Sequence, residues 1–179
     1  MDAQLWAADG VANAECGVSD GTSRVALATS NGFSGEREST YLWVGSSLTL
    51  TQSDGKLNES WMWGGACNRS DVPKAADMAR IAIERGRLRD GSTKGPSEKT
   101  TMVVDPSVAG DILARLISAA SGRAMDQDQS FWKGRLGTQA VSKVLTVTDD
   151  PLVKRGLASR TFDGEGVAAQ ALPLIEAGV

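Results

Sequence analysis

The sequence predicts an α+β fold, in which an antiparallel β-sheet comes first and amphipathic helices follow it. Residues 24–63 alternate apolar and polar side chains, as half-buried strands do, and this stretch holds two turn signals, Asn31-Gly32 and Asp54-Gly55. Residues 73–120 change to the spacing of about 3.6 residues that is typical of helices. Short extended runs return after residue 144, so we expect further β structure near the end of the chain.

The composition is that of a globular protein: 41% of the 179 residues are hydrophobic and 23% are charged. The 19 basic and 22 acidic residues give a net charge of −3, which argues against direct nucleic-acid binding, because phosphate contacts require a basic surface. The sequence shows no signal-peptide pattern, and no stretch is long and apolar enough to span a bilayer. We therefore expect a cytoplasmic protein without a membrane segment.

The chain contains no histidine. Catalysis by a Ser-His-Asp or Cys-His arrangement is therefore excluded within it, as are zinc sites that depend on imidazole ligands. Cys16 and Cys67 are too few for a disulfide framework, and we expect both to be free thiols.

Two hairpins form the predicted sheet. A strand over residues 24–30 precedes the Asn31-Gly32 turn, and the next strand, Leu42 to Leu50, carries its apolar side chains at even positions. The chain then turns at Asp54-Gly55 into a further alternating strand.

Three tryptophans lie on these strands. Trp61 and Trp63 share a strand face with Leu57, so we expect both indoles to be buried in the sheet core. Trp43 lies on the less apolar face of its strand, and we expect it to be the more exposed of the three.

Two helices are expected after the sheet. The first runs from Pro73 to about Leu88, and the loop Arg89–Lys99 that follows it is the best internal boundary. Thr101–Val104 predicts a short strand, and Asp105-Pro106 then supplies an N-cap and a first-turn proline for a helix that ends near Gly122. The apolar side chains that we expect this second helix to bury are Val108, Ala109, Ile112, Leu113, Leu116, Ile117 and Ala120.

The last part of the chain predicts strands at Val144–Thr148 and Ala168–Val179. Residues 164–169, Gly-Glu-Gly-Val-Ala-Ala, fit a loose dinucleotide-binding fingerprint. That motif requires an apolar strand before it and a helix after it, and neither is present. We interpret this segment as a turn.

Five segments occur in the order that the TldD/PmbA peptidase family has them, and together they resemble that family over nearly the whole chain. They are Val11–Glu15 with Ala28–Gly35, Val103–Pro106 with Ala109-Gly110, Ser130–Trp132 with Leu136-Gly137, Thr148–Pro151 with Phe162–Val167, and Leu174–Val179. The resemblance implies an internal piece of a longer protein. It assigns residues 1–68 to the β-rich end of the first domain, 69–150 to a central α/β region and 151–179 to the start of the C-terminal β domain.

The resemblance also locates the family's zinc helix. In the TldD branch this helix carries a His-Glu-x-x-x-His motif, and alignment on Gly110 and Leu113 puts Ala114 and Ala119 at the histidine positions and Arg115 at the glutamate position. Alanine cannot ligate zinc, and arginine cannot activate a metal-bound water and repels the dication. The chain is therefore similar to the TldE/PmbA branch, which has no zinc motif, and we expect no cofactor in it.

Four carboxylates belong to the segment that carries the most distinctive resemblance: Asp149, Asp150, Asp163 and Glu165. They could bind a divalent cation, or they could cap turns and pair with Arg155 and Arg160. Their spacing fits no calcium-binding loop, so we favour the structural role.

The resemblance implies a non-catalytic TldE/PmbA-type subunit of a TldD/TldE metallopeptidase complex, which processes and degrades peptides. Zinc is then expected only in the TldD-type partner, and this chain would be inactive alone. Two alternatives stay open. The chain could be part of a metallopeptidase whose ligands lie outside this piece, or of a regulatory binding protein that modulates DNA gyrase.

Overall fold

The computed structural model describes all residues, 1–179, and the chain forms two compact units. The first unit comprises Met1–Lys94 and Asp150–Ala171, and the second unit comprises Gly95–Asp149 and Leu172–Val179. Antiparallel strands and helices occur in both units, so the predicted α+β class is confirmed.

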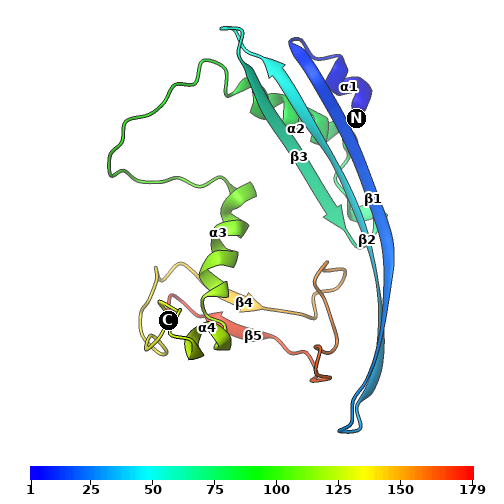
Figure 1. The fold of residues 1–179 in the computed structure, drawn as a ribbon, viewed down its shortest axis with the longest axis vertical. Coiled ribbons are helices and arrows are strands. Elements are labelled where there is room, and N and C mark those ends of the chain that lie inside the picture. The colour runs from blue at the N-terminus through cyan, green and yellow to red at the C-terminus, as the bar shows by residue number, and fades with distance from the viewer. The chain divides into compact units, whose positions relative to one another are not determined.

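The first unit is built on a three-stranded antiparallel sheet in the order β1-β2-β3 (Figure 1). The strands are β1 (Val11–Ala28), β2 (Ser34–Thr51) and β3 (Leu57–Ala66). Gly32 and Gly55 lie in the two connecting turns with φ of 93° and 83°, values that favour glycine. Both predicted hairpins are therefore confirmed.

Two helices cover one face of this sheet. They are α1 (Asp2–Trp6) and α2 (Ala75–Arg87), and α2 is the predicted first helix. The even-numbered side chains Leu48 and Leu50 of β2 pack against Ala79 and Ala82 of α2 in the buried core. Within it, the buried Ser60 hydroxyl donates to the carbonyl of Ala82 at 2.8 Å, which satisfies both polar groups.

The β1–β2 hairpin also buries its opposite face, the one that the helices do not cover, near the turn that joins its two strands. There Phe162, from the segment 150–171, is buried against Phe33 with ring centroids 5.1 Å apart. The guanidinium of Arg37 lies 5.7 Å from the centroid of the Phe162 ring. Because side chains alternate along a strand, odd-numbered Arg37 and even-numbered Leu48 are on opposite faces of β2. One end of the hairpin therefore packs on helices, and the other end packs on a loop.

The prediction that Trp61 and Trp63 are buried is wrong, since they are 53% and 50% exposed. They lie on the odd face of β3, whereas α2 covers the even face, on which Ser60 is buried. Because α2 packs on the even face, the indoles on the odd face remain exposed. The prediction that Trp43 is the most exposed of the three tryptophans is also wrong, because at 41% it is the least exposed.

The second unit contains α3 (Pro106–Ser118), α4 (Gly122–Asp126) and the two-stranded antiparallel sheet of β4 (Val147–Asp149) and β5 (Leu172–Ile175). Asp105 caps α3, because its carboxylate accepts from the backbone N–H of Ser107 at 2.8 Å. The strand predicted at Thr101–Val104 is wrong, since these residues form no regular structure.

The expected burial of α3 is also wrong, because none of its residues is buried. Val108 and Ile112 are exposed, while Leu113, Leu116 and Ile117 are half-buried. The short α4 and the two short strands offer too little surface to cover the apolar stripe. The indole of Trp132 supplies one contact, donating to the carbonyl of Leu116 at 2.7 Å.

Candidate functional site

The counterparts of the zinc motif lie at the C-terminal end of α3. Ala114 and Arg115 are in its last turns, and Ala119 is the C-cap residue. Ala114 and Arg115 are exposed and Ala119 is half-buried. Their side chains offer two methyl groups and a cation, so this stretch has no group that could hold a divalent metal ion. Among the chain's Cys, Asp and Glu residues, no three lie together as a metal site would require.

Two of the four carboxylates of the signature segment, Asp150 and Asp163, cap local turns, whereas Asp149 ends strand β4. Asp150 accepts from the backbone N–H of Leu152 at 2.9 Å. Asp163 accepts from the backbone N–H groups of Val167 and Glu165, both at 2.9 Å. These hydrogen bonds, first that from Val167, hold the pKa of Asp163 below its ordinary value. The segment that resembled a dinucleotide fingerprint is therefore a turn that Asp163 organises.

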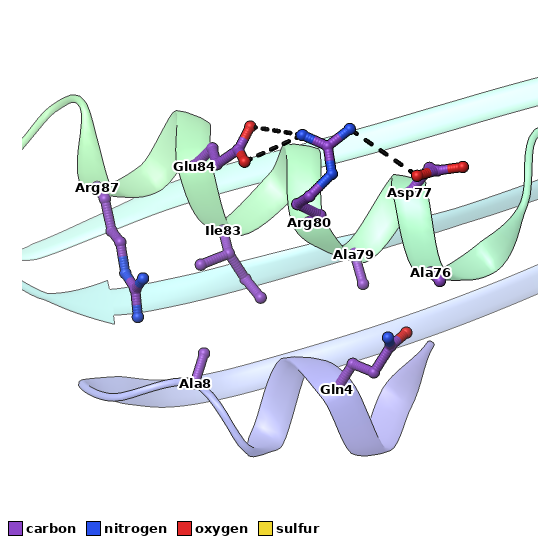
Figure 2. A pocket seen from close by; sticks show the side chains of 9 residues that line it. All are labelled: Gln4, Ala8, Ala76, Asp77, Ala79, Arg80, Ile83, Glu84 and Arg87. Atoms are coloured by element: carbon purple, nitrogen blue, oxygen red, sulfur yellow. Dashed lines mark hydrogen bonds and ion pairs between the residues drawn. The ribbon is translucent and has the colours of Figure 1, made fainter.

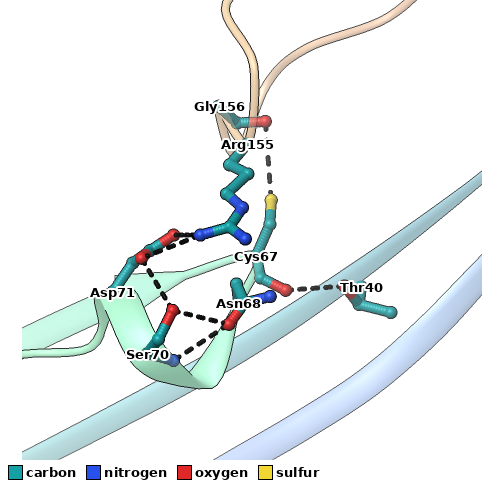
Figure 3. Close-up of polar contacts among 7 residues, drawn as sticks. All are labelled: Thr40, Cys67, Asn68, Ser70, Asp71, Arg155 and Gly156. Atoms are coloured by element: carbon teal, nitrogen blue, oxygen red, sulfur yellow. Dashed lines mark hydrogen bonds and ion pairs between the residues drawn. The ribbon is translucent and has the colours of Figure 1, made fainter.

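Arg155 attaches the segment 150–171 to the short helix that follows β3 (Figure 3). Its guanidinium donates to both carboxylate oxygens of Asp71, at 3.2 and 3.1 Å, in the short helix η1 (Arg69–Asp71). Beside this pair, the free thiol of Cys67 lies 3.5 Å from the carbonyl of Gly156. Arg155 therefore pairs with Asp71, which sequence reasoning did not propose as its partner.

An aromatic surface occupies the exposed odd face of the sheet, formed by Tyr41, Trp43, Trp61 and Trp63. Two of its indoles lie on glycines of neighbouring strands, because Trp43 pairs with Gly65 and Trp63 with Gly45 in the strand register. A Cβ on Gly65 or Gly45 would come within 2.4 Å of the Trp43 ring or 2.2 Å of the Trp63 ring. The glycines thus let the rings lie flat against the backbone, as aromatic side chains do over strand glycines.

A cationic groove adjoins this surface, between the β1–β2 hairpin and residues 157–161. It consists of two adjoining cavities of about 270 and 220 Å³, which Arg37, Ser39, Ser159 and Arg160 line in common. Ser23 lines the larger cavity, directly opposite Ser39 in the strand register. Sequence reasoning missed this groove. Arg37, Ser39, Tyr41 and Trp43 alternate along β2 and so predict a shared face, but nothing in the sequence indicates that Arg160 meets it.

A wider hollow of about 510 Å³ lies between α1 and α2 (Figure 2). Arg80 donates to both carboxylate oxygens of Glu84 at 3.0 Å and lies 3.9 Å from Asp77. The charges of Asp77, Arg80 and Glu84 therefore compensate one another. The hollow contains no unpaired acid or nucleophile arranged for chemistry.

Two family models cover nearly all of the chain. The PmbA/TldA metallopeptidase central domain matches residues 1–89, and the PmbA/TldA metallopeptidase C-terminal domain matches residues 97–179. The chain therefore belongs to the PmbA/TldD metallopeptidase family. The first match ends at residue 89 and the second begins at residue 97, both within the loop Arg89–Lys99. The finer division at residues 68/69 and 150/151 stays a prediction.

Curated relatives match most of the chain. A protein from Methanocaldococcus jannaschii is 28% identical over 164 residues, which are 91% of this chain and 37% of that protein. The metalloprotease PmbA of Escherichia coli is 28% identical over 138 residues, which are 75% of this chain and 30% of that protein. The chain thus spans about a third of the length of these relatives.

Solved structures share the fold. A Bacteroides thetaiotaomicron protein, provisionally described as a modulator of DNA gyrase, superimposes with a TM-score of 0.90 at 28% identity, covering 99% of this chain and 41% of that one. TldE from Thermococcus kodakarensis superimposes with a TM-score of 0.74 at 18% identity, covering 99% of this chain and 40% of that one. The second likeness shows the fold alone. None of the helices combines the length and apolar character needed to cross a membrane.

Proposed function

We propose that this chain is part of a TldE/PmbA-type subunit that is itself non-catalytic and acts with a zinc-bearing TldD-type peptidase on peptides. Membership of the PmbA/TldD metallopeptidase family and the likeness to E. coli PmbA support the peptidase setting. The proposed partner, the peptide substrates and a cytoplasmic location all follow from this assignment.

One observation carries the proposal: the residue types at the end of α3. A hydrolytic zinc site requires ligands that donate electron pairs and a base that activates the metal-bound water. Ala114 and Ala119 have no donor atom, and Arg115 brings a positive charge where the motif has a carboxylate. A peptidase built on this helix needs its metal from another subunit.

The test combines the purified chain with a TldD-type protein from the same organism. Metal analysis of this chain after incubation with zinc, followed by dialysis, is expected to give well below one equivalent. Peptide hydrolysis is expected to be absent with this chain alone, and to rise when it is added to the TldD-type protein. A stoichiometric zinc, or hydrolysis that a chelator abolishes in the chain alone, would contradict the proposal and favour a metallopeptidase in its own right.

A second candidate function is regulatory binding to DNA gyrase. It is favoured by the 28% identical Bacteroides protein and by a Thermotoga maritima protein of the same fold, both described provisionally as gyrase modulators. Affinity capture with tagged chain separates the two functions, since the first predicts a TldD-type protein among the captured partners and the second predicts gyrase.

A further inference from the structure

The cationic groove, lined by Arg37, Ser39, Ser159 and Arg160, has a defined shape. Val25 pairs with Arg37 and Ser23 with Ser39 across β1 and β2, so these four side chains project from one face of the hairpin. Hydrogen bonds within the segment 150–171 hold the opposite wall.

Two hydrogen bonds within the segment 150–171 support that wall. The backbone N–H of Arg160 donates to the carbonyl of Pro151 at 2.8 Å, and the hydroxyl of Ser159 donates to the carbonyl of Val153 at 2.6 Å. Arg37 is positioned from the strand side, where its guanidinium lies over the ring of the buried Phe162. Two half-buried arginines therefore border one preformed groove.

The charge of the groove differs from that of the chain. The ionisable side chains that line it are Arg37, Arg160 and Glu38, and the Asp163 carboxylate outside the lining interacts electrostatically with Arg160, whereas the whole chain has a net charge of −3. Guanidinium groups match carboxylate and phosphate oxygens with two donors each, and serine hydroxyls add further donors. The chemistry of the groove thus suits an oxyanion.

The aromatic surface extends from this groove along β2. Tyr41 and Trp43 follow Ser39 on the same strand face, and both rings are exposed. A strand rises by about 3.4 Å per residue, so Arg37 and Trp43 are separated by about 20 Å, which is the length of about six extended residues. An occupant that matches this surface has an apolar extended part and one anionic end.

We propose that the cationic groove binds the carboxylate of an extended peptide whose apolar residues lie on Tyr41 and Trp43. This inference rests on the proposed function, because it deepens how the chain would handle peptides. Charge complementarity favours this occupant over a cationic or purely apolar one. In this proposal Arg37 is the principal ligand of the carboxylate, and Arg160 and the hydroxyls of Ser23 and Ser39 lie beside it.

The experiment measures binding of an N-acetylated apolar hexapeptide by titration calorimetry with the full chain. The peptide is prepared with a free C-terminal carboxylate, as a C-terminal amide, and as an amide with a glutamate at its last position. We expect the free-carboxylate peptide to bind at least tenfold more tightly than the plain amide. The glutamate amide carries a carboxylate at the same end, so it is also expected to bind more tightly than the plain amide.

Arg37→Gln is expected to abolish this tenfold preference, and Arg37→Lys, which keeps the charge, to restore part of it. Arg24→Gln is the matched control, because Arg24 lies on the opposite face of the same hairpin, paired with Glu36 at 2.8 Å. The Arg24→Gln variant is expected to prefer the free-carboxylate peptide over the amide as strongly as the unchanged chain does. Circular dichroism of each variant confirms that the fold is retained.

Equal binding of carboxylate and amide peptides would overturn the inference. So would an unchanged preference in Arg37→Gln, or binding of inorganic phosphate without binding of the carboxylate peptide. Stimulation of a TldD-type peptidase is measured separately with unchanged chain. If stimulation is present but the carboxylate preference is absent, only the groove assignment fails. If stimulation is absent, the proposed function fails.

Discussion

Leu48 lies in the centre of the core between the sheet and α2, with 1% of its surface exposed. Truncation to alanine removes buried methyl groups and leaves a cavity, so Leu48→Ala is expected to lower the free energy of unfolding by about 2–5 kcal/mol. Leu57→Ala is the matched control, because Leu57 is 64% exposed on the same sheet. Its effect is expected to stay within about 0.5 kcal/mol. Urea denaturation followed by circular dichroism measures both changes, and equal losses would contradict the assigned core.

Asp163 links the stability of its turn to pH. Its pKa is lowered in the folded chain, first by the hydrogen bond from Val167, so the ionised form is favoured by folding. The stabilisation is therefore present above the unfolded value of about 3.9 and is lost as pH falls through the lower folded value.

Comparison with Asp163→Asn tests this linkage. The stability difference between the unchanged chain and the variant is expected to be greatest near neutral pH and to shrink on acidification. Carboxyl NMR titration of Asp163, with the amide signal of Val167 as a second probe, gives the folded pKa. A titration at or above the ordinary aspartate value would show that the turn does not hold the carboxylate.

At the scale of elements, α3 contains a glycine in its interior, Gly110, with open space where a side chain would project. A Cβ built on Gly110 meets no atom within 4 Å. Gly110→Ala is therefore expected to stabilise the helix by about 0.5–1 kcal/mol, because alanine loses less backbone entropy on folding. Thermal melting of the helical signal measures the change. A lower melting temperature would mean that the position is covered by something that the chain alone does not show.

The Asp71–Arg155 pair joins two elements that are distant in sequence. Its side chains are 39% and 51% exposed, so solvent weakens the attraction. A double-mutant cycle with Asp71→Ala and Arg155→Ala is expected to give a coupling of about 0.2–1 kcal/mol. A coupling indistinguishable from zero would mean that the thiol of Cys67 and the backbone hydrogen bonds hold the segment without the ion pair.

Elements with strong local signals were predictable. The glycine turns define both hairpins, and Asp105-Pro106 defines the start of α3. Thr101–Val104 was mispredicted because four apolar or β-branched residues satisfy a strand pattern without a neighbouring strand to pair with. A strand requires hydrogen bonds to another segment, which local sequence cannot supply.

At the scale of the whole molecule, the connection between α2 and α3 is a long exposed stretch of backbone without helix or strand. Its residues form turns or irregular structure and are almost all exposed. Brief trypsin treatment is therefore expected to cleave first after Lys94 or Lys99, before Arg24 in β1 or Arg80 in α2. Mass spectrometry of the early fragments identifies the site. First cleavage within β1 or α2 would contradict the division into two units at this loop.

The sequence by itself determined the α+β class, the hairpins, α2 and the residue types Ala114, Arg115 and Ala119, on which the proposed function depends. These features follow from local backbone preferences or from side-chain chemistry, which do not change with packing.

The tertiary structure alone decided which face of each strand is covered. The exposed indoles of Trp61 and Trp63 and the meeting of Arg37 with Arg160 could not be predicted, because alternation along a strand defines two faces but does not say which of them another element will bury. The cationic groove exists only because a distant loop packs on one end of a hairpin whose other end packs on helices.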